Sequence, residues 1–193
     1  MPTTTTYNAP DVRLVREFLN TLDVDEGVDE LGSADQLATW LRARGLLGPG
    51  EGADDGELAL ARELREALRA ELSTHAGAPA DPGGRRVLDE LAARMPLRVT
   101  FAAGPAPALA AVDGGARAGL SAVLAAVVAL AGTGAWRRLK ICPAGDCAWV
   151  FYDESRNRSR RWCSMDVCGN RSKLRAYRTR HGGTGGGSSP SGA

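Results

Sequence analysis

Four cysteines in two pairs of equal spacing stand in the C-terminal part of this 193-residue chain. Four residues separate Cys142 from Cys147 within the sequence CPAGDC, and four also separate Cys163 from Cys168. Tetrahedral Zn²⁺ takes four soft or borderline ligands, and two thiolate pairs on tight turns supply such a set. The spacing therefore predicts one Zn²⁺ ion held by all four cysteines.

Three other interpretations of the cysteines are weaker. Free buried cysteines would not explain two equal spacings, a reducing compartment disfavours disulfides, and a redox pair would be spaced Cys-x-x-Cys. Four protein ligands leave no open coordination position, which favours a structural over a catalytic metal. Arg171 and backbone amides near Cys168 are expected to offset the negative charge of the thiolates. His75 and His181 are interpreted as ordinary surface histidines.

Charge divides the chain into an acidic body and a basic C-terminal region. Residues 1–135 carry 12 Lys+Arg against 19 Asp+Glu, whereas residues 136–181 carry 12 against 4. Such an asymmetry indicates a polyanionic partner for the basic region. Residues 182–193 are rich in glycine and serine, and we expect them to be disordered.

Basic side chains in the loop between the cysteine pairs, and in a helix predicted after Cys168, favour DNA as that partner. Phosphate contacts would supply affinity, and arginine in the major groove reads guanine. The candidate DNA-contacting residues are Arg156, Arg158, Arg160, Arg161, Arg171, Lys173, Arg175, Arg178 and Arg180. A merely solvated basic surface is the alternative interpretation.

Local patterns predict the fold of the cysteine-rich region. Residues 149–152 alternate as a strand, 160–163 form its return strand, and residues 171–181 form a helix with Leu174 and Tyr177 on its buried side. Asn170 or Ser172 is expected to cap that helix. The order of knuckle, hairpin, knuckle and helix is that of treble-clef-like zinc fingers. The aromatic side chains are expected in the small core, with stacking on single-stranded bases as the alternative; they are Trp149, Tyr152 and Trp162.

The sequence of the body, residues 1–135, predicts a mostly helical α+β domain. Apolar periodicity predicts helices near residues 9–24, 32–47, 54–77, 85–95 and 117–131. Asp11 and Ser33 are expected to cap the first two helices. Residues 96–101 alternate as a strand, with 108–115 as a weaker hairpin partner. Glycines at 132–134 mark the expected boundary, which gives three parts: residues 1–135, 136–181 and 182–193.

The remaining features concern location and small-molecule chemistry. The apolar run at 118–132 is shorter than the roughly 20 residues that span a bilayer, so we expect a buried core helix and no membrane partner. The N-terminus lacks the basic and apolar segments of a signal peptide, which predicts a cytoplasmic protein. Asn20 and Asp23 lie beside an apolar stripe; they either line a ligand pocket or end a helix. No catalytic arrangement is visible, so an enzyme is not expected.

The C-terminal region resembles the CGNR zinc finger. That finger is named after a four-residue motif, which occurs here as Cys168-Gly169-Asn170-Arg171. The likeness covers about residues 136–181 and includes FYD and RRWCSMDVCGNR. Upstream, EFLNTLD and LATWLRARGLL resemble the ABATE domain that precedes this finger in bacterial proteins. The resemblance implies a stress-related bacterial transcription regulator whose finger binds DNA.

Together these observations predict a zinc-dependent DNA-binding regulator. Its acidic body is expected to sense a small-molecule effector or to form a homodimer. The homodimer is expected because a single finger would bind a short site weakly. A zinc-stabilised RNA-binding module or a protein adaptor is the alternative.

Overall fold

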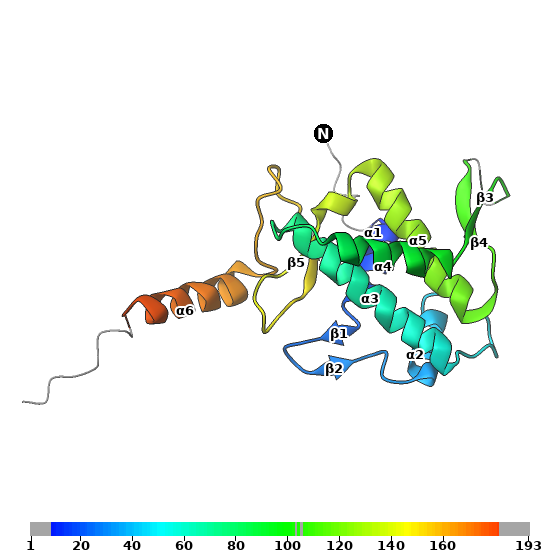
Figure 1. Ribbon diagram of the computed structural model, residues 1–193, viewed down its shortest axis with the longest axis horizontal. Helices are drawn as coiled ribbons and strands as arrows, with labels where there is room; N and C mark the ends of the chain where they lie inside the picture. Colours follow the sequence, from blue (N-terminus) through cyan, green and yellow to red (C-terminus); the bar gives the residue numbers. More distant parts are fainter. Residues whose placement is uncertain (1–8, 103, 105, 182–193) are drawn as a thin grey trace, which may run out of the picture.

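The computed structural model describes residues 9–102, 104 and 106–181 (Figure 1). The helices are α1 (Pro10–Leu19), α2 (Ala34–Arg42), α3 (Asp55–His75), α4 (Pro82–Ala93), α5 (Gly115–Thr133) and α6 (Asn170–His181). Three antiparallel hairpins accompany them: β1 (Leu22–Asp23) with β2 (Val28–Asp29), β3 (Leu97–Thr100) with β4 (Ala108–Ala111), and β5 (Leu139–Ile141) with β6 (Val150–Tyr152). The helix-rich α+β class with small hairpins is confirmed.

Helix α3 is the longest helix, and its sequence explains its extent. Asp54 accepts a hydrogen bond from the Glu57 amide, and the Glu57 carboxylate accepts one from the Asp54 amide. Such a capping box satisfies two amides that the first helical turn leaves without intrahelical partners, and a side-chain cap is typically worth about 1 kcal/mol. Leucines at four-residue intervals then bury one face of the helix; they are Leu60, Leu64, Leu68 and Leu72.

The predicted helix starts are correct at α2 and wrong at α1. Ser33 Oγ accepts a hydrogen bond from the Gln36 amide at 3.2 Å, as expected. Helix α1 instead begins one residue before the predicted cap, because Pro10 occupies its first turn and Ala9 precedes it without a side-chain cap. Proline suits that position because it has no amide hydrogen to satisfy. Asp11 is therefore inside the first turn, where the helix dipole favours a carboxylate.

The central core is built by α1, α2, α3 and α5. Helix α5 buries one face, which includes Leu120, Val123 and Leu130, and approaches α2 closely at Gly119. A Cβ added at Gly119 would lie 2.9 Å from the Leu46 carbonyl oxygen, so only glycine fits there without rearrangement. By length and composition α5 is also the one helix of the described residues that is apolar enough to cross a membrane. A single such helix is weak evidence for a span, and its buried face belongs to the core.

The β5–β6 hairpin is part of the same core. Leu139 and Val150 are fully buried, and Tyr152 is nearly so. The sequence-based prediction that 149–152 pairs with 160–163 is wrong: β6 pairs with β5, with Lys140 opposite Phe151. The reason is that β5 lies immediately before Cys142, so the first cysteine pair forms the turn of the hairpin.

Buried polar contacts join this hairpin to the body. The Asn20 side chain donates to the Val150 carbonyl at 2.9 Å and accepts from the Val150 amide at 2.8 Å. Arg69 of α3 donates to the Leu19 carbonyl at 2.6 Å and to the Ala148 carbonyl at 3.0 Å. Because these contacts satisfy backbone groups on both sides, the first half of the cysteine-rich region is fixed to the helices.

His75 also joins α3 to this hairpin and is not an ordinary surface residue. Its Nδ1 donates to the Leu139 carbonyl at 2.9 Å, and its ring meets Trp136 edge to face at a centroid distance of 5.3 Å. Burial lowers the pKa of His75 below 6.5, against the opposing effect of that hydrogen bond. The folded protein therefore favours the neutral imidazole.

This lowered pKa predicts an acid-dependent loss of stability. Below the unfolded pKa of 6.5, the unfolded chain takes up a proton that folded His75 resists, so the free energy of unfolding falls as pH decreases toward the folded pKa. We expect His75→Gln to flatten this dependence between about pH 7 and pH 5. Urea unfolding of the zinc-loaded protein across that range measures it, and identical pH profiles for both proteins would contradict the assignment.

Candidate metal centre

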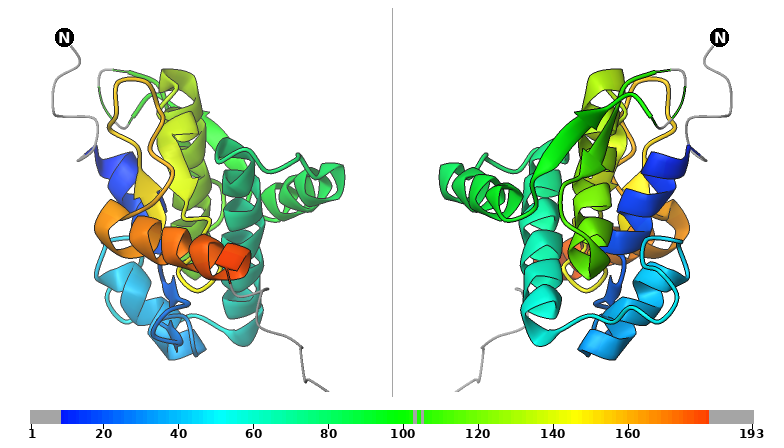
Figure 2. Two further views of the ribbon diagram at one scale, coloured as in Figure 1. Left: turned by 90° about the vertical axis from the view of Figure 1, so that its left-hand side faces the viewer. Right: turned by 90° about the vertical axis from the view of Figure 1, so that its right-hand side faces the viewer.

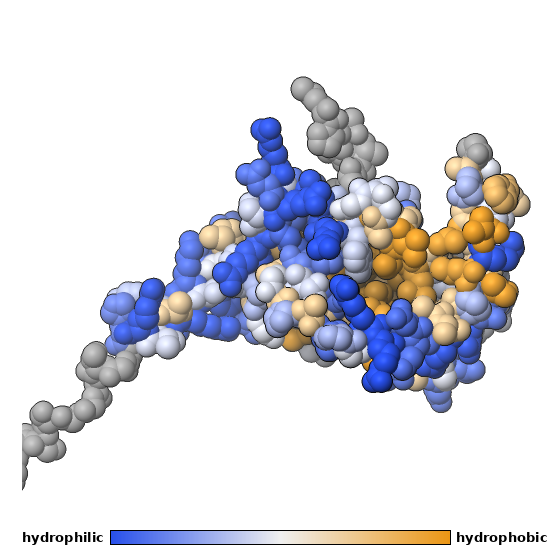
Figure 3. Space-filling model, turned by 45° about the horizontal axis from the view of Figure 1, so that its top comes forward, coloured by the Kyte–Doolittle hydropathy of each residue, from blue (hydrophilic) through white to orange (hydrophobic). Residues whose placement is uncertain are grey.

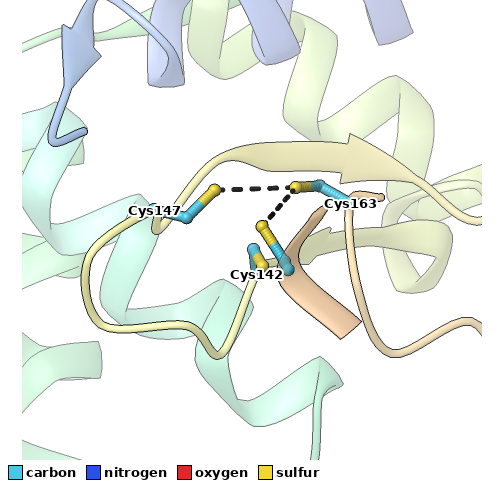
Figure 4. A group of neighbouring side chains, drawn as sticks. Cys142, Cys147 and Cys163 are labelled. Atoms are coloured by element: carbon cyan, nitrogen blue, oxygen red, sulfur yellow. Dashed lines mark hydrogen bonds between the residues drawn. The ribbon is translucent and has the colours of Figure 1, made fainter. Parts of the chain in front are cut away.

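The four cysteine sulphurs converge on one point, although they come from different elements. Each Sγ lies within 4.8 Å of the others. Cys147 Sγ is 3.5 Å from Cys163 Sγ, which is 3.6 Å from Cys168 Sγ. Figure 4 shows the side chains of Cys142, Cys147 and Cys163 pointing toward one another. Tetrahedral coordination with Zn–S bonds of about 2.3 Å requires sulphurs about 3.8 Å apart, so the arrangement fits Zn²⁺.

Local backbone structure explains how two turns present these sulphurs. Cys142 and Trp149 close the first turn, because the Cys142 amide donates to the Trp149 carbonyl at 2.9 Å. Ala148 within that turn has a φ of 48°, a left-handed conformation that is unusual for alanine. Arg69 bonds the carbonyl of this same residue and so stabilises the strained turn.

The second cysteine turn differs from the prediction. A π-helical turn, Met165–Gly169, precedes α6 and contains Cys168. Ser164 caps it by accepting from the Val167 amide at 3.3 Å, so neither Asn170 nor Ser172 is the cap. Asn170 instead donates to the Asp166 carbonyl at 3.1 Å. Helical structure therefore begins with this turn, which holds Cys168 at the metal site, and α6 continues from it at Asn170.

A small apolar cluster surrounds the sulphurs. Phe151 and Ala144 are buried with the cysteines, and Trp162 packs against them half-buried. Trp149 stays 37% exposed, while Tyr152 lies in the core of the body rather than in that of the finger. The expectation that these aromatics form the small core of the finger is thus correct for the packing of Trp162; Tyr152 is buried, but in the body, and Trp149 is exposed.

Without a metal, the thiols differ in acidity. Burial raises the pKa of the Cys147 thiol to about 11, and burial also raises the pKa of Cys163. Burial opposes ionisation of Cys168 as well, but hydrogen bonds from the other thiols and from Arg171 outweigh it and lower the pKa of Cys168. Binding of Zn²⁺ therefore releases protons, since thiolates are the ligands.

Arg171 lies beside the metal site, where it contacts a cysteine sulphur and two carboxylates. Its Nη2 lies 3.8 Å from Cys168 Sγ, as expected for a cation that offsets thiolate charge. Its Nη1 pairs with Asp146 at 2.8 Å and with Asp25, in the loop between β1 and β2, at 3.4 Å. Arg175 pairs with the same Asp146 at 2.7 Å. The sequence analysis missed Asp146, although its position directly before Cys147 could have indicated it.

A buried ion pair organises the basic loop between the cysteine pairs. Lys140 Nζ lies 2.6 Å from Asp153 Oδ2 and also donates to the carbonyls of Arg158 and Arg160. Asp153 is fully buried, and Lys140 is only 7% exposed. Asp153 further accepts from the amides of Ser155 and Arg160, so its two oxygens are well satisfied. This network fixes the course of residues 153–160.

The structure divides the predicted DNA-contacting residues into two groups. The first group is engaged locally: Arg171 and Arg175 pair with Asp146, and the Arg160 guanidinium donates to the carbonyls of Trp162 and Cys163. Arg161 is exposed and lies 5.3 Å from the Trp162 ring centroid. The second group is exposed and forms no ion pair among the described residues. It consists of Arg156, Arg158, Lys173, Arg178 and Arg180.

Helix α6 buries none of its residues, so the predicted buried stripe is wrong. Leu174 is 50% exposed and Tyr177 is 55% exposed. The helix leaves the metal site and extends away from the body (Figure 1), and it lies in front of the body when viewed along that direction (Figure 2, left). No described element lies alongside it to cover these two side chains.

Asn20 and Asp23 do not form a common pocket. Asn20 lines a cavity of about 410 Å³ between α1, β6 and the turn after α2, together with Arg16 and Trp149. Both ends of its amide are nevertheless occupied by Val150. Asp23 lies outside that cavity and accepts hydrogen bonds from the amides of Asp25 and Glu26 in the β1–β2 turn. Asp23 thus stabilises a turn rather than ending a helix.

Two family models match the chain. Residues 12–134 match the ABATE model, described as "putative stress-induced transcription regulator". This chain belongs to the ABATE family. Residues 138–181 match the CGNR zinc finger, so the four cysteines are the ligands of one structural zinc ion in that ABATE chain. No curated protein matches the sequence.

Removal of zinc should loosen only the outer part of the CGNR finger. The β5–β6 hairpin is held by the ABATE core, whereas the turn around Cys168 and α6 depend on the metal site. We expect a strong chelator to abolish amide protection in residues 163–175 and to leave Leu139 and Val150 protected. Hydrogen exchange measured with and without chelator tests this, and equal loss in β5 and β6 would contradict it.

The buried ion pair gives a second prediction. Lys140→Met leaves Asp153 buried without its cation, which should lower the free energy of unfolding by about 3–5 kcal/mol. Lys173→Met is the matched control, because Lys173 is the only other lysine and is exposed on α6. Chemical denaturation compares the two. Similar small effects for both variants would show that the Lys140 pair contributes little.

Proposed function

We propose that this ABATE-family chain regulates transcription by binding duplex DNA through its zinc finger. The observation that carries the proposal is α6, an exposed basic helix that projects from the body (Figure 1). Its 12 residues span about 18 Å, and a helix of this size fits the B-DNA major groove. Lys173, Arg178 and Arg180 are exposed on it without ion pairs among the described residues.

The basic loop supports the same proposal. Arg156 and Arg158 are exposed there and are available for phosphate contacts. The Lys140–Asp153 network holds the backbone of this loop, which reduces the conformational entropy lost on binding. The zinc then positions the start of α6 relative to the loop, because Cys168 lies in the turn before α6 and Cys163 follows the loop.

The proposed activity is binding rather than catalysis. A zinc ion with four thiolate ligands has no open position for a substrate or an activated water, which supports a structural role. The small-molecule effector and the cytoplasmic location remain predictions. Among the described residues, the cavity beside Asn20 is the candidate site for such an effector.

DNA binding should depend on the unpaired basic residues of α6. We expect the triple variant Lys173→Ala, Arg178→Ala, Arg180→Ala to weaken binding of duplex DNA, because each side chain would neutralise a phosphate. The slope of log K against log salt should fall by about 2.7, or about 0.9 for each lost contact. Fluorescence anisotropy over a salt series, with pooled genomic duplexes, measures both quantities.

A matched triple variant controls for net charge. Arg13→Ala, Arg86→Ala, Arg98→Ala removes the same charge from exposed positions of the body and should leave the slope unchanged. Arg171 and Arg175 are unsuitable for this test, because their loss also breaks the contacts with Asp146. Equal affinity of wild type and the α6 variant for duplex DNA would refute the proposal. If wild type binds structured RNA more tightly than duplex DNA of equal length, the finger is an RNA-binding module.

A further inference from the structure

The cavity of about 410 Å³ beside Asn20 is lined by both parts of the chain. Residues of α1 and of the turn after α2 form the body side, and β6, Arg160 and Cys163 form the finger side. Its volume lies within the range of small-molecule sites, which is about 300–1,000 Å³. Because the zinc ligand Cys163 is among the lining residues, a molecule in the cavity would lie against the body and the metal centre together.

Arginine dominates the charged lining of the cavity. Arg16, Arg44 and Arg160 come from three separate segments of the chain. Two carboxylates oppose them less strongly. Glu17 is paired with Arg44 at 2.9 Å, and solvent screens the charge of exposed Glu30 more than that of half-buried Arg16. The cavity therefore favours an anion.

Two of these guanidinium groups are held in place and have N–H groups to spare. Arg44 donates through Nη1 to the Trp40 carbonyl at 3.1 Å and stacks 3.9 Å from the Trp40 ring centroid. Arg160 donates through Nε and Nη2 to the carbonyls of Trp162 and Cys163. Nη2 of Arg44 and Nη1 of Arg160 donate to no acceptor within the described residues. Such guanidinium groups suit a carboxylate, and little side-chain entropy is lost when it binds.

Aromatic side chains supply the apolar part of the lining. Trp149 lines the cavity and is 37% exposed, while Phe151 and Tyr152 line it and are mostly buried. The exposed part of the indole offers a flat surface to a second ring. The surface at the finger end of the molecule is otherwise mostly hydrophilic, and hydrophobic surface gathers at the opposite end (Figure 3). Charged donors beside aromatic faces are typical of small-molecule sites.

We propose that this cavity binds a small aromatic carboxylate, which joins the body to the zinc finger. Arg44 and Arg160 bind the carboxylate, and the ring packs on Trp149. The inference rests on the effector role proposed for the cavity, but it does not require the finger to bind DNA. Arg160 also bonds the Cys163 carbonyl, so an anion on Arg160 favours the loop conformation that presents Cys163 to zinc. Ligand and zinc therefore stabilise each other, since coupling between two sites is reciprocal.

An NMR titration of the zinc-loaded full chain with phenylacetate tests the site. This probe carries one carboxylate and one phenyl ring, and molecules of its size reach millimolar affinity. We expect saturable shifts of the Trp149 indole N–H and of the Cys163 amide. Phenethylamine, which carries an ammonium group in place of the carboxylate, should cause none. Equal affinity for the amine, or no saturable binding of phenylacetate at millimolar concentration, would overturn the inference.

Two cavity variants with matched controls locate the binding. Arg44→Gln should raise the Kd of phenylacetate about tenfold or more, as expected for loss of a hydrogen bond between charged groups. Its control, Arg42→Gln, changes an exposed arginine outside the cavity and should leave the Kd unchanged. Trp149→Ala should also weaken binding, whereas Phe101→Ala, at an exposed ring outside the cavity, should not. An unchanged Kd in both cavity variants, shown to be folded by circular dichroism, would refute the site.

Transfer of zinc to a colorimetric chelator tests the coupling. Saturating phenylacetate should slow zinc release from the wild type. The same concentration should leave the rate unchanged in Trp149→Ala, which controls for direct contact between the probe and zinc. Equal release rates with and without phenylacetate in the wild type would refute the coupling. Neither measurement contains DNA, so a failure here is distinct from a failure of DNA binding.

Discussion

Packing of the β5–β6 hairpin against α1 and α3 is the constraint on which the C-terminal region depends. Three side chains of the hairpin lie in the core of the body, and Asn20, Arg69 and His75 bond its backbone carbonyls. The turn that holds the first cysteine pair is therefore attached to the body by contacts that do not involve the metal. Zinc then links the second cysteine pair, Cys163 and Cys168, to the turn that carries the first pair. This differs from a finger that folds only when it binds its metal.

A second layer of organisation comes from charges that are neutralised within the finger. Lys140 and Asp153 fix the loop, and Asp146 pairs with Arg171 and Arg175 beside the cysteine site. Each acidic group thus has a cation whose geometry it determines. The basic character that remains at the surface comes from residues farther along α6 and from the outer part of the loop. Net charge alone does not reveal this division, because it counts paired and unpaired arginines equally.

Sequence patterns predicted the features that depend on local spacing. Leucine periodicity identified α3, Ser33 marked the start of α2, and the equal cysteine spacing identified the metal ligands. Contacts between distant segments were not predictable in the same way. The alternation at 149–152 identified a strand but not its partner, because strand pairing depends on which segment the core brings alongside. Leu174 and Tyr177 have helical spacing, yet no other described part of the chain packs over these two side chains.

The long axis of the molecule has a different surface at each end. The basic helix α6 lies at one end and the β3–β4 hairpin at the other (Figure 1). A polyanion that binds α6 would therefore leave the hairpin end of the body uncovered. The two ends can meet different molecules, because contact at one end does not block the other.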